Sequence, residues 1–340
     1  MKYKTLALFF VGIGVLAVMV LFIGPGEVES AIALANPWYV AIAVLVQLAI
    51  YGLWTFRWDI TIKSLDIVAK KRHILPMLMV GLAINNLTPS GRGGGEPVRA
   101  YVLGKYSGSP MENAFATVVA DRGLDTFPFV VLAVFSIIYS VLYLKLSEIT
   151  IGALVAALLI LLAAFFIIIY MCINEGAGKK ITLWLVRLIK RFSRKEHSNI
   201  ETKALKALYN FQDSIKSMMK NRNVLMYGLP LSFIIWFFEI ARVYIVFSAF
   251  GVQVSPGVIA VVFVIATLIG MIPLLPGGLG AVDGIMILMY SIAGVPPSIS
   301  AAATIVERLI SFWMTSVIGM LLLPYFGTGV LDKVSEEMGQ

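Results

Sequence analysis

Long runs of apolar residues, separated by short polar or glycine-rich segments, recur along almost the whole chain. A helix needs about 20 mostly apolar residues to cross the hydrocarbon core of a bilayer. The pattern therefore predicts an all-α integral membrane protein, a single polytopic domain over residues 1–340. About six transmembrane helices are expected, at Leu6–Ile23, Trp38–Phe56, Thr126–Leu144, Ile149–Cys172, Val224–Phe250 and Ile299–Leu323.

Two further apolar stretches are interrupted by proline and glycine. Ile74–Leu87 is only 14 residues long, and Gly257–Leu275 is followed by a second short stretch, Ile285–Ala293. Apolar segments that are short or broken in this way are typical of re-entrant hairpins, which enter and leave the membrane on one side. The breaks contain Pro89, Gly94 and Gly95 in the first stretch, and Pro276, Gly277, Gly278 and Gly280 in the second.

The two broken stretches resemble each other. In each, a proline precedes a carboxylate by seven residues: Pro89 and Glu96 in the first, Pro276 and Asp283 in the second. A glycine and a proline bracketing one residue follow in both, and eleven residues later come Asp121-Arg122 and Glu307-Arg308 respectively. This ordered series predicts a repeat, with one copy over 57–144 and an inverted copy over 224–323.

Charge sets the expected orientation. The net charge is +8, but the basic residues cluster in a few loops, which indicates cytoplasmic loops rather than nucleic-acid binding. The segment 174–223 holds twelve Lys and Arg, whereas Gly24–Pro37 holds none. With both hairpins re-entrant, both termini are expected in the cytoplasm and the hairpins open on opposite sides of the membrane.

The segment 174–223 contains two amphipathic stretches. In the first, Trp184, Leu185 and Leu188 alternate with basic residues such as Arg187 and Lys190. A basic amphipathic helix beside a span usually lies on anionic lipid. Docking of a partner protein is the alternative interpretation.

Ionisable residues occur beside or within the apolar segments, where each would cost about 2.5–3.5 kcal/mol at the centre of a span. They are therefore expected to converge on one polar cavity, and Glu239 and Arg242, three residues apart, could pair. Carboxylates could neutralise neighbouring arginines or lock the hairpins. Alternatively, they hold arginines that bind an anion, because the arginine fork matches phosphate. The set is Glu96, Arg99, Asp121, Arg122, Asp125, Glu239, Arg242, Asp283, Glu307 and Arg308.

The glycines of the breaks have two compatible interpretations. Without side chains they let backbone N–H groups approach a ligand at the starts of helices near Glu96 and Asp283, or they simply form tight turns. Neither break completes a nucleotide-binding motif, and no motif of a metal-dependent or nucleophilic enzyme occurs. A protein that is no enzyme and needs no cofactor or metal is expected.

The residues around both breaks resemble one known family, the lysylphosphatidylglycerol synthase transmembrane family, also called the flippase-like domain family. The resemblance rests on Asn86-Leu87-Thr88-Pro89, Gly94-Gly95-Glu96-Pro97 with Arg99, Asp121-Arg122, Pro276-Gly277-Gly278-Leu279-Gly280 with Asp283, and Glu307-Arg308. It implies movement of a phospholipid or polyprenyl-phosphate carrier between leaflets, and it allows a homodimer. Bacterial relatives carry an aminoacyl-transferase domain after the membrane part. This chain ends at Gln340, so lysyl transfer is not expected.

The sequence thus predicts a lipid transporter of the cell membrane whose partner is an anionic lipid. Arg99, Arg122, Arg242 and Arg308 are expected to contact phosphate, and Glu96, Asp121, Asp283 and Glu307 to orient them or carry a coupling proton. Glu239 and the break residues Pro89, Gly94, Gly95, Gly277, Gly278 and Gly280 complete the expected substrate site. The alternatives are an ion-coupled carrier of a small soluble anion and a non-transporting subunit that recruits a partner through 174–223.

Overall fold

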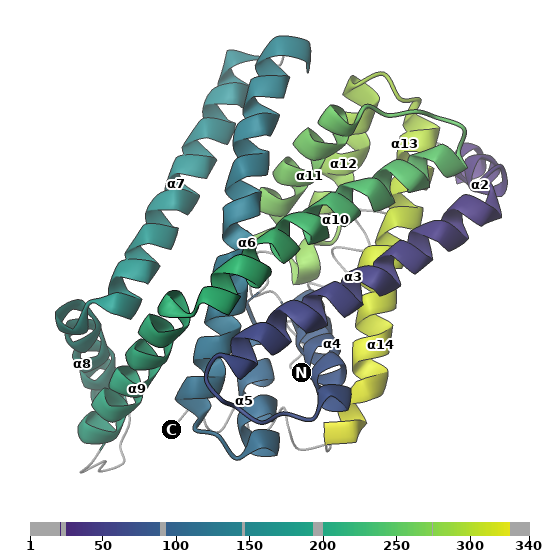
Figure 1. Ribbon diagram of the computed structural model, residues 1–340. Coiled ribbons are helices and arrows are strands. Elements are labelled where there is room, and N and C mark those ends of the chain that lie inside the picture. The colour runs from purple at the N-terminus through teal and green to yellow at the C-terminus, as the bar shows by residue number, and fades with distance from the viewer. Residues whose placement is uncertain are drawn as a thin grey trace.

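The protein is predominantly helical in the part of the chain that the computed structural model describes, which is residue 21 and residues 25–88, 93–144, 147–192, 200–273 and 275–326. No strand occurs in these ranges, so the predicted all-α class is confirmed (Figure 1). The α-helices are α2 Pro25–Ala33, α3 Pro37–Lys63, α4 Lys71–Leu87, α5 Glu96–Ser107, α6 Met111–Tyr139, α7 Glu148–Ile173, α8 Glu175–Phe192, α9 Ile200–Lys220, α10 Leu229–Ala249, α11 Pro256–Gly270, α12 Ala281–Ile292, α13 Pro297–Arg308 and α14 Met314–Leu322. Short helical turns of other types join or extend them: η1 Ser140–Leu144, η2 Val224–Gly228, η3 Pro276–Gly278, η4 Leu309–Trp313 and η5 Leu323–Phe326.

Five helical segments within the described ranges are long and apolar enough to cross a membrane: Pro37–Lys63, Met111–Leu144, Glu148–Ile173, Val224–Ala249 and Pro297–Phe326. They match five of the expected spans, and the sixth, Leu6–Ile23, lies outside the described residues except for Leu21. Two helices extend further than expected. Helix α3 continues past Phe56 through buried Arg57 and Asp59, and α6 begins at Met111 rather than Thr126. Both extensions carry polar residues buried against other helices, which a search for apolar runs passes over.

Two long helices, α3 and α10, cross the centre of the molecule side by side (Figure 1). On one side of this pair, α4 and α5 form the first broken hairpin, in the lower part of the view, and α11 and α12 form the second, in the upper part. Each hairpin leads into a further helix, α6 after the first and α13 continuing into α14 after the second. The chain therefore presents the helix order long, short, short, long in both halves.

The breaks of the two hairpins meet inside the protein. The turn η3 packs against α4, and a Cβ atom on Gly277 would lie 2.8 Å from the backbone oxygen of Asn86. The Asn86 side chain donates hydrogen bonds to the Phe312 backbone oxygen at 3.3 Å and to Ser316 Oγ at 3.0 Å. These contacts join the first hairpin to the second hairpin and to α14. The duplication of the chain stays a prediction.

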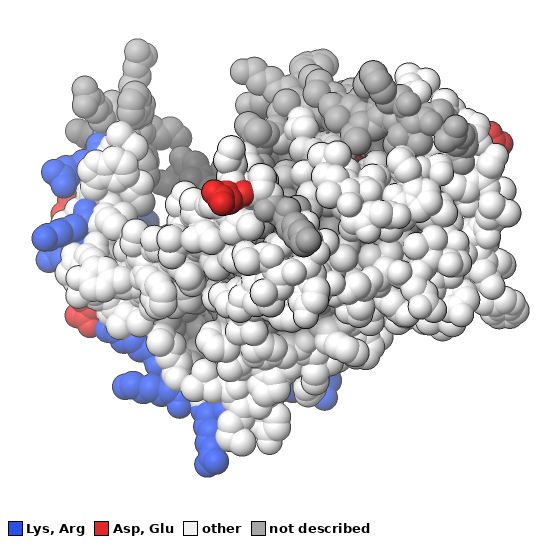
Figure 2. Space-filling view, turned by 90° about the horizontal axis from the view of Figure 1, so that it is seen from above, with Lys and Arg blue, Asp and Glu red and all other residues white. Residues whose placement is uncertain are grey.

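The basic segment folds as α8 and α9. Of these, α9 packs against α6, and α8 packs against α7 and α9, where Gly178 approaches Leu208 and Gln212 of α9. The predicted apolar stripe Trp184, Leu185 and Leu188 is exposed on α8. Seen from above, the face near the ends of α11 to α13 carries few charged side chains, and Lys and Arg gather along the edge nearer α8 and α9 (Figure 2). This distribution agrees with a basic cytoplasmic side; the choice between lipid and a partner protein on α8 stays open.

Candidate functional site

Two networks of buried ion pairs occupy the interior, one beside each hairpin. The first network comprises Arg57, Glu96, Arg99, Asp121, Arg122 and Asp125. The second network comprises Glu239, Arg242, Asp283, Glu307 and Arg308. All nine charged positions that were expected to form the substrate site fall within these two networks.

Asp121 is the centre of the first network. Its two carboxylate oxygens accept hydrogen bonds from Arg57 Nε at 2.8 Å and from Arg99 Nη2 at 2.9 Å. Both guanidinium groups are almost fully buried, with 2% and 1% exposure. Arg57 also donates to Asp125 at 2.6 Å, and the Arg99 guanidinium lies over the Trp58 ring, 4.2 Å from its centroid. Asp121 thus joins α3, α5 and α6 through one buried carboxylate.

Glu96, the first residue of α5, links the hairpin to α6. Its carboxylate pairs with Arg122 at 2.5 Å and with Arg99 at 3.3 Å, and it accepts a hydrogen bond from the Asn85 side chain at 3.1 Å. Arg122 is the most exposed arginine of the two networks, at 38%. Among the arginines of the two networks it is therefore the one most accessible to a ligand.

The second network has two parts. Arg242 on α10 lies between two carboxylates, with Glu239 at 2.6 Å and Glu307 at 2.8 Å, and it also donates to Gln47 on α3. Arg308 pairs with Asp283 at 2.7 Å and donates to the backbone oxygen of Gly277 at 3.2 Å. The two parts tie α13 to α10 and to the second hairpin.

Corresponding positions of the predicted repeat make corresponding contacts. Arg122 binds the carboxylate at the start of α5, and Arg308 binds the carboxylate in the first turn of α12. The preceding residues, Asp121 and Glu307, bind buried arginines of α3 and α10. In both halves an arginine on the long helix after the hairpin therefore fixes the break, while its neighbouring carboxylate fixes the central helix pair.

The structure shows which carboxylates and arginines pair, and it adds one residue to the site. Asp121 and Arg122 do not pair with each other, nor do Glu307 and Arg308, because successive residues of a helix point about 100° apart. The pair Glu239–Arg242 forms as expected. The added residue is Arg57, which follows the end of the predicted span Trp38–Phe56 and is buried in the first network.

The glycines of the breaks form tight, internally bonded turns. Gly277, Gly278 and Gly280 have φ angles of 55°, 68° and 78°, which L-residues with side chains rarely adopt. The N–H groups of Gly95 and Gly280 donate to Asn85 and Asp283. In this conformation these two N–H groups serve the turn rather than a ligand.

Of the two remaining break residues, Gly94 and Pro89, the structure describes Gly94. Gly94 lies in the turn just before α5, and Pro89 lies outside the described residues. Helix α12 begins at Ala281, two residues before Asp283, so that Asp283 caps the helix instead of starting it. The breaks are therefore built to hold the helix ends in place.

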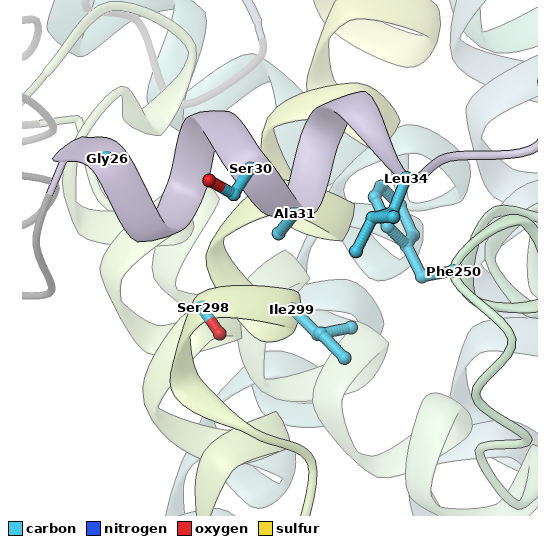
Figure 3. A pocket seen from close by; sticks show the side chains of 7 residues that line it. All are labelled: Gly26, Ser30, Ala31, Leu34, Phe250, Ser298 and Ile299. Carbon is cyan, nitrogen blue, oxygen red and sulfur yellow. The ribbon is translucent and has the colours of Figure 1, made fainter.

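A cavity of about 710 Å³ lies elsewhere, between α2, the end of α10 and the start of α13. Figure 3 shows Ala31 of α2, and Leu34 just after its end, opposite Ser298 and Ile299 of α13. None of the lining residues belongs to either ion-pair network. The cavity is therefore separate from the candidate site.

Comparison with known proteins adds a family likeness. A family model described as the lysylphosphatidylglycerol synthase TM region matches residues 9–319. A UPF0104 membrane protein of Methanothermobacter thermautotrophicus is 56% identical over 99% of this chain and 100% of its own length. The UPF0104 membrane protein MJ1595 of Methanocaldococcus jannaschii is 32% identical over 91% and 90%. Glycosyltransferase AglD of Haloferax volcanii is 23% identical over 90% of this chain, which covers 51% of AglD.

Proposed function

Because this chain belongs to the lysylphosphatidylglycerol synthase transmembrane family, we propose that it is a transporter that moves an anionic lipid between membrane leaflets. The lipid is a phospholipid or a polyprenyl phosphate, whose phosphate meets the arginines while its tails stay in hydrocarbon. The proposal takes the cell membrane as the location and the side of α8 and α9 as cytoplasmic. It concerns movement of the lipid, without a catalytic step.

One observation carries this proposal: two broken hairpins meet inside the protein, each tied to the following helix by an arginine–carboxylate pair. Broken helices that meet near the midplane form the substrate sites of many secondary transporters. Buried ion pairs add little net stability compared with apolar packing, so simple anchoring does not account for two such networks. A transport site accounts for both networks of ion pairs.

Phosphate suits these arginines chemically. A guanidinium offers two parallel N–H donors to two phosphate oxygens, as it does to a carboxylate. A lipid phosphate can therefore replace Glu96 at Arg122, and Asp283 at Arg308, without leaving either cation unpaired. The greater exposure of Arg122 makes it the first contact and Arg308 the second.

Replacing either arginine should slow lipid movement. We expect Arg122→Ala and Arg308→Ala to lower the translocation of fluorescent phosphatidylglycerol in proteoliposomes by about tenfold or more, since a charge-assisted hydrogen bond contributes about 1.5–3 kcal/mol. Arg122→Lys should recover part of the rate, because it keeps the charge but loses the fork. The exposed Arg222 of the basic segment provides the control, and Arg222→Ala should keep the wild-type rate.

The same vesicles separate this proposal from a carrier of soluble anions. Uptake of labelled phosphate or small carboxylates without lipid movement would favour that carrier. Unchanged lipid rates in both alanine variants, with folding verified by size-exclusion chromatography, would remove the arginines from the mechanism.

A further inference from the structure

The two networks differ in their balance of charge. Among the described residues, the first network has three arginines and three carboxylates, whereas the second has two arginines and three carboxylates. Arg92 lies outside the described residues and is not counted. The second network therefore carries one negative charge in excess when all its groups are ionised.

The excess lies at Arg242. This arginine alone faces both Glu239 and Glu307, while Asp283 has Arg308 for itself. Arg242 is 1% exposed, and the two glutamates are 9% and 4% exposed. An uncompensated charge at such depth is costly, and the usual remedy is to neutralise it with a proton or a cation.

Two hydroxyl groups beside this trio are buried without a hydrogen-bond partner in the described part of the chain. They are Tyr290 Oη on α12 and Thr304 Oγ1 on α13, each 1% exposed. Thr304 lies one turn before Glu307 on α13, and the charges of Glu307 and Arg242 act on the Tyr290 hydroxyl. Buried hydroxyls of this kind can donate a hydrogen bond to a carboxylate or accept one from the O–H group of a carboxylic acid. The hydrogen bonds of these two hydroxyl groups can therefore change when a neighbouring carboxylate gains or loses a proton.

A proton fits this place better than a metal ion. Arg242 lies between the two carboxylates, with one Nη atom directed to each. It thereby fills the position that a metal bridging them would need. No group of three or more candidate metal-binding side chains occurs among the described residues. A proton needs no coordination shell.

We propose that Glu239 and Glu307 together hold one exchangeable proton, with Arg242 balancing the carboxylate that stays ionised. The proton comes from water and adds to a carboxylate oxygen, forming a neutral carboxylic acid, and no other bond changes. Glu239 is the receiving residue, because it faces a second like charge, Asp125, and its greater exposure gives water access to it.

Four of the elements around the pair contribute a polar or charged neighbour, and α11, which packs against α10, has no charged residue. Helix α3 presents Gln47 and Tyr51, α12 presents Tyr290, α13 presents Thr304, and Asp125 of α6 acts on Glu239 from the first network. Apart from Arg242, none of these groups brings a positive charge. The surroundings therefore favour uptake of a proton over ionisation of both glutamates.

The consequence for transport rests on the proposed function. If lipid moves through the site, binding and release of this proton couple the movement to a pH gradient. The proton itself can be detected without any transport assay. The proposal of a shared proton and the proposal of lipid transport can therefore be refuted independently.

Infrared difference spectroscopy of the reconstituted full chain tests the proposal through the carbonyl band of a protonated carboxyl group at pH 7. The wild type should show this band, and both Glu239→Gln and Glu307→Gln should lose it, because one remaining carboxylate is balanced by Arg242 and stays ionised. Glu175→Gln, which removes an exposed carboxylate paired with Lys216, should keep it. Absence of the band in the wild type would overturn the proposal, as would its persistence in either folded glutamine variant.

Discussion

Replacing Asp121 by asparagine should cost the folded protein about 3–5 kcal/mol of stability, because it leaves two buried guanidinium groups without their shared carboxylate. Arg57 and Arg99 are almost fully buried, and among the described residues each keeps one other carboxylate, Asp125 at 2.6 Å and Glu96 at 3.3 Å. Asparagine keeps the size of the side chain, so packing is unchanged and charge is the variable. The measurement is denaturant unfolding of the purified protein in detergent micelles.

A second substitution separates charge from packing. Adding Arg99→Met to Asp121→Asn leaves Arg57 with Asp125 and Arg122 with Glu96, which restores the balance of the first network. The double variant should recover at least about 1 kcal/mol relative to the sum of the single variants. Asp213→Asn, at an exposed position of α9, should change stability by less than about 0.5 kcal/mol. A loss below about 1 kcal/mol for Asp121→Asn would show that the network does not hold the helices together.

Among glycine-to-alanine substitutions in the described residues, Gly95→Ala should lower the stability of the protein most. A Cβ atom at Gly95 would lie 1.9 Å from the backbone oxygen of Gly81 and 2.6 Å from its carbonyl carbon. Backbone atoms cannot rotate away as a side chain can, so α4 and α5 would have to separate at the break. We expect a loss of about 3 kcal/mol or more, at the upper end of overpacking effects.

The control for this change is Gly152→Ala on α7. A Cβ atom there meets nothing within 4 Å, and alanine favours a helix interior over glycine by about 1 kcal/mol. Thermal unfolding should therefore show Gly152→Ala at or slightly above the wild-type midpoint and Gly95→Ala well below it. Equal midpoints for the two variants would contradict the close approach of the two helices.

Much of the fold follows from the spacing of apolar runs, but the limits of its helices do not. The run ending at Phe56 was expected to end a span, yet the helix continues through Arg57 and Asp59, because these polar residues are buried. Pattern reasoning treats a charge after an apolar run as a sign of water. The pattern along one helix does not show that a residue of another helix pairs with that charge inside the protein.

The site was predictable in its members but not in its pairings. Repeat spacing located Glu96, Asp121, Asp283 and Glu307 without any coordinates. The partners depend on which way each helix faces, and that is set by packing between segments more than 20 residues apart, as between Glu96 and Arg122.

Arg57 could have been found by extending the repeat upstream with a shift of two residues, because Glu96 and Asp283 lie 187 positions apart. It lies 185 positions before Arg242, the same offset that separates Gln47 from Ser232. The structure uses both positions reciprocally, since Arg57 donates to Ser232 at 3.1 Å and Arg242 donates to Gln47. The offset was therefore the available signal.

The sidedness of the two hairpins tests the account most directly. Lys105 at the end of α5 and Ser291 at the end of α12 occupy equivalent positions of the predicted repeat. The chain has one cysteine, Cys172, which is first replaced by serine. Each of the two positions is then converted to cysteine in a separate variant. In sealed vesicles, a membrane-impermeant maleimide should label Lys105→Cys from the side of α8 and α9 and Ser291→Cys from the opposite side. Labelling of both cysteines from the same side would contradict two oppositely directed hairpins and, with them, the transport site.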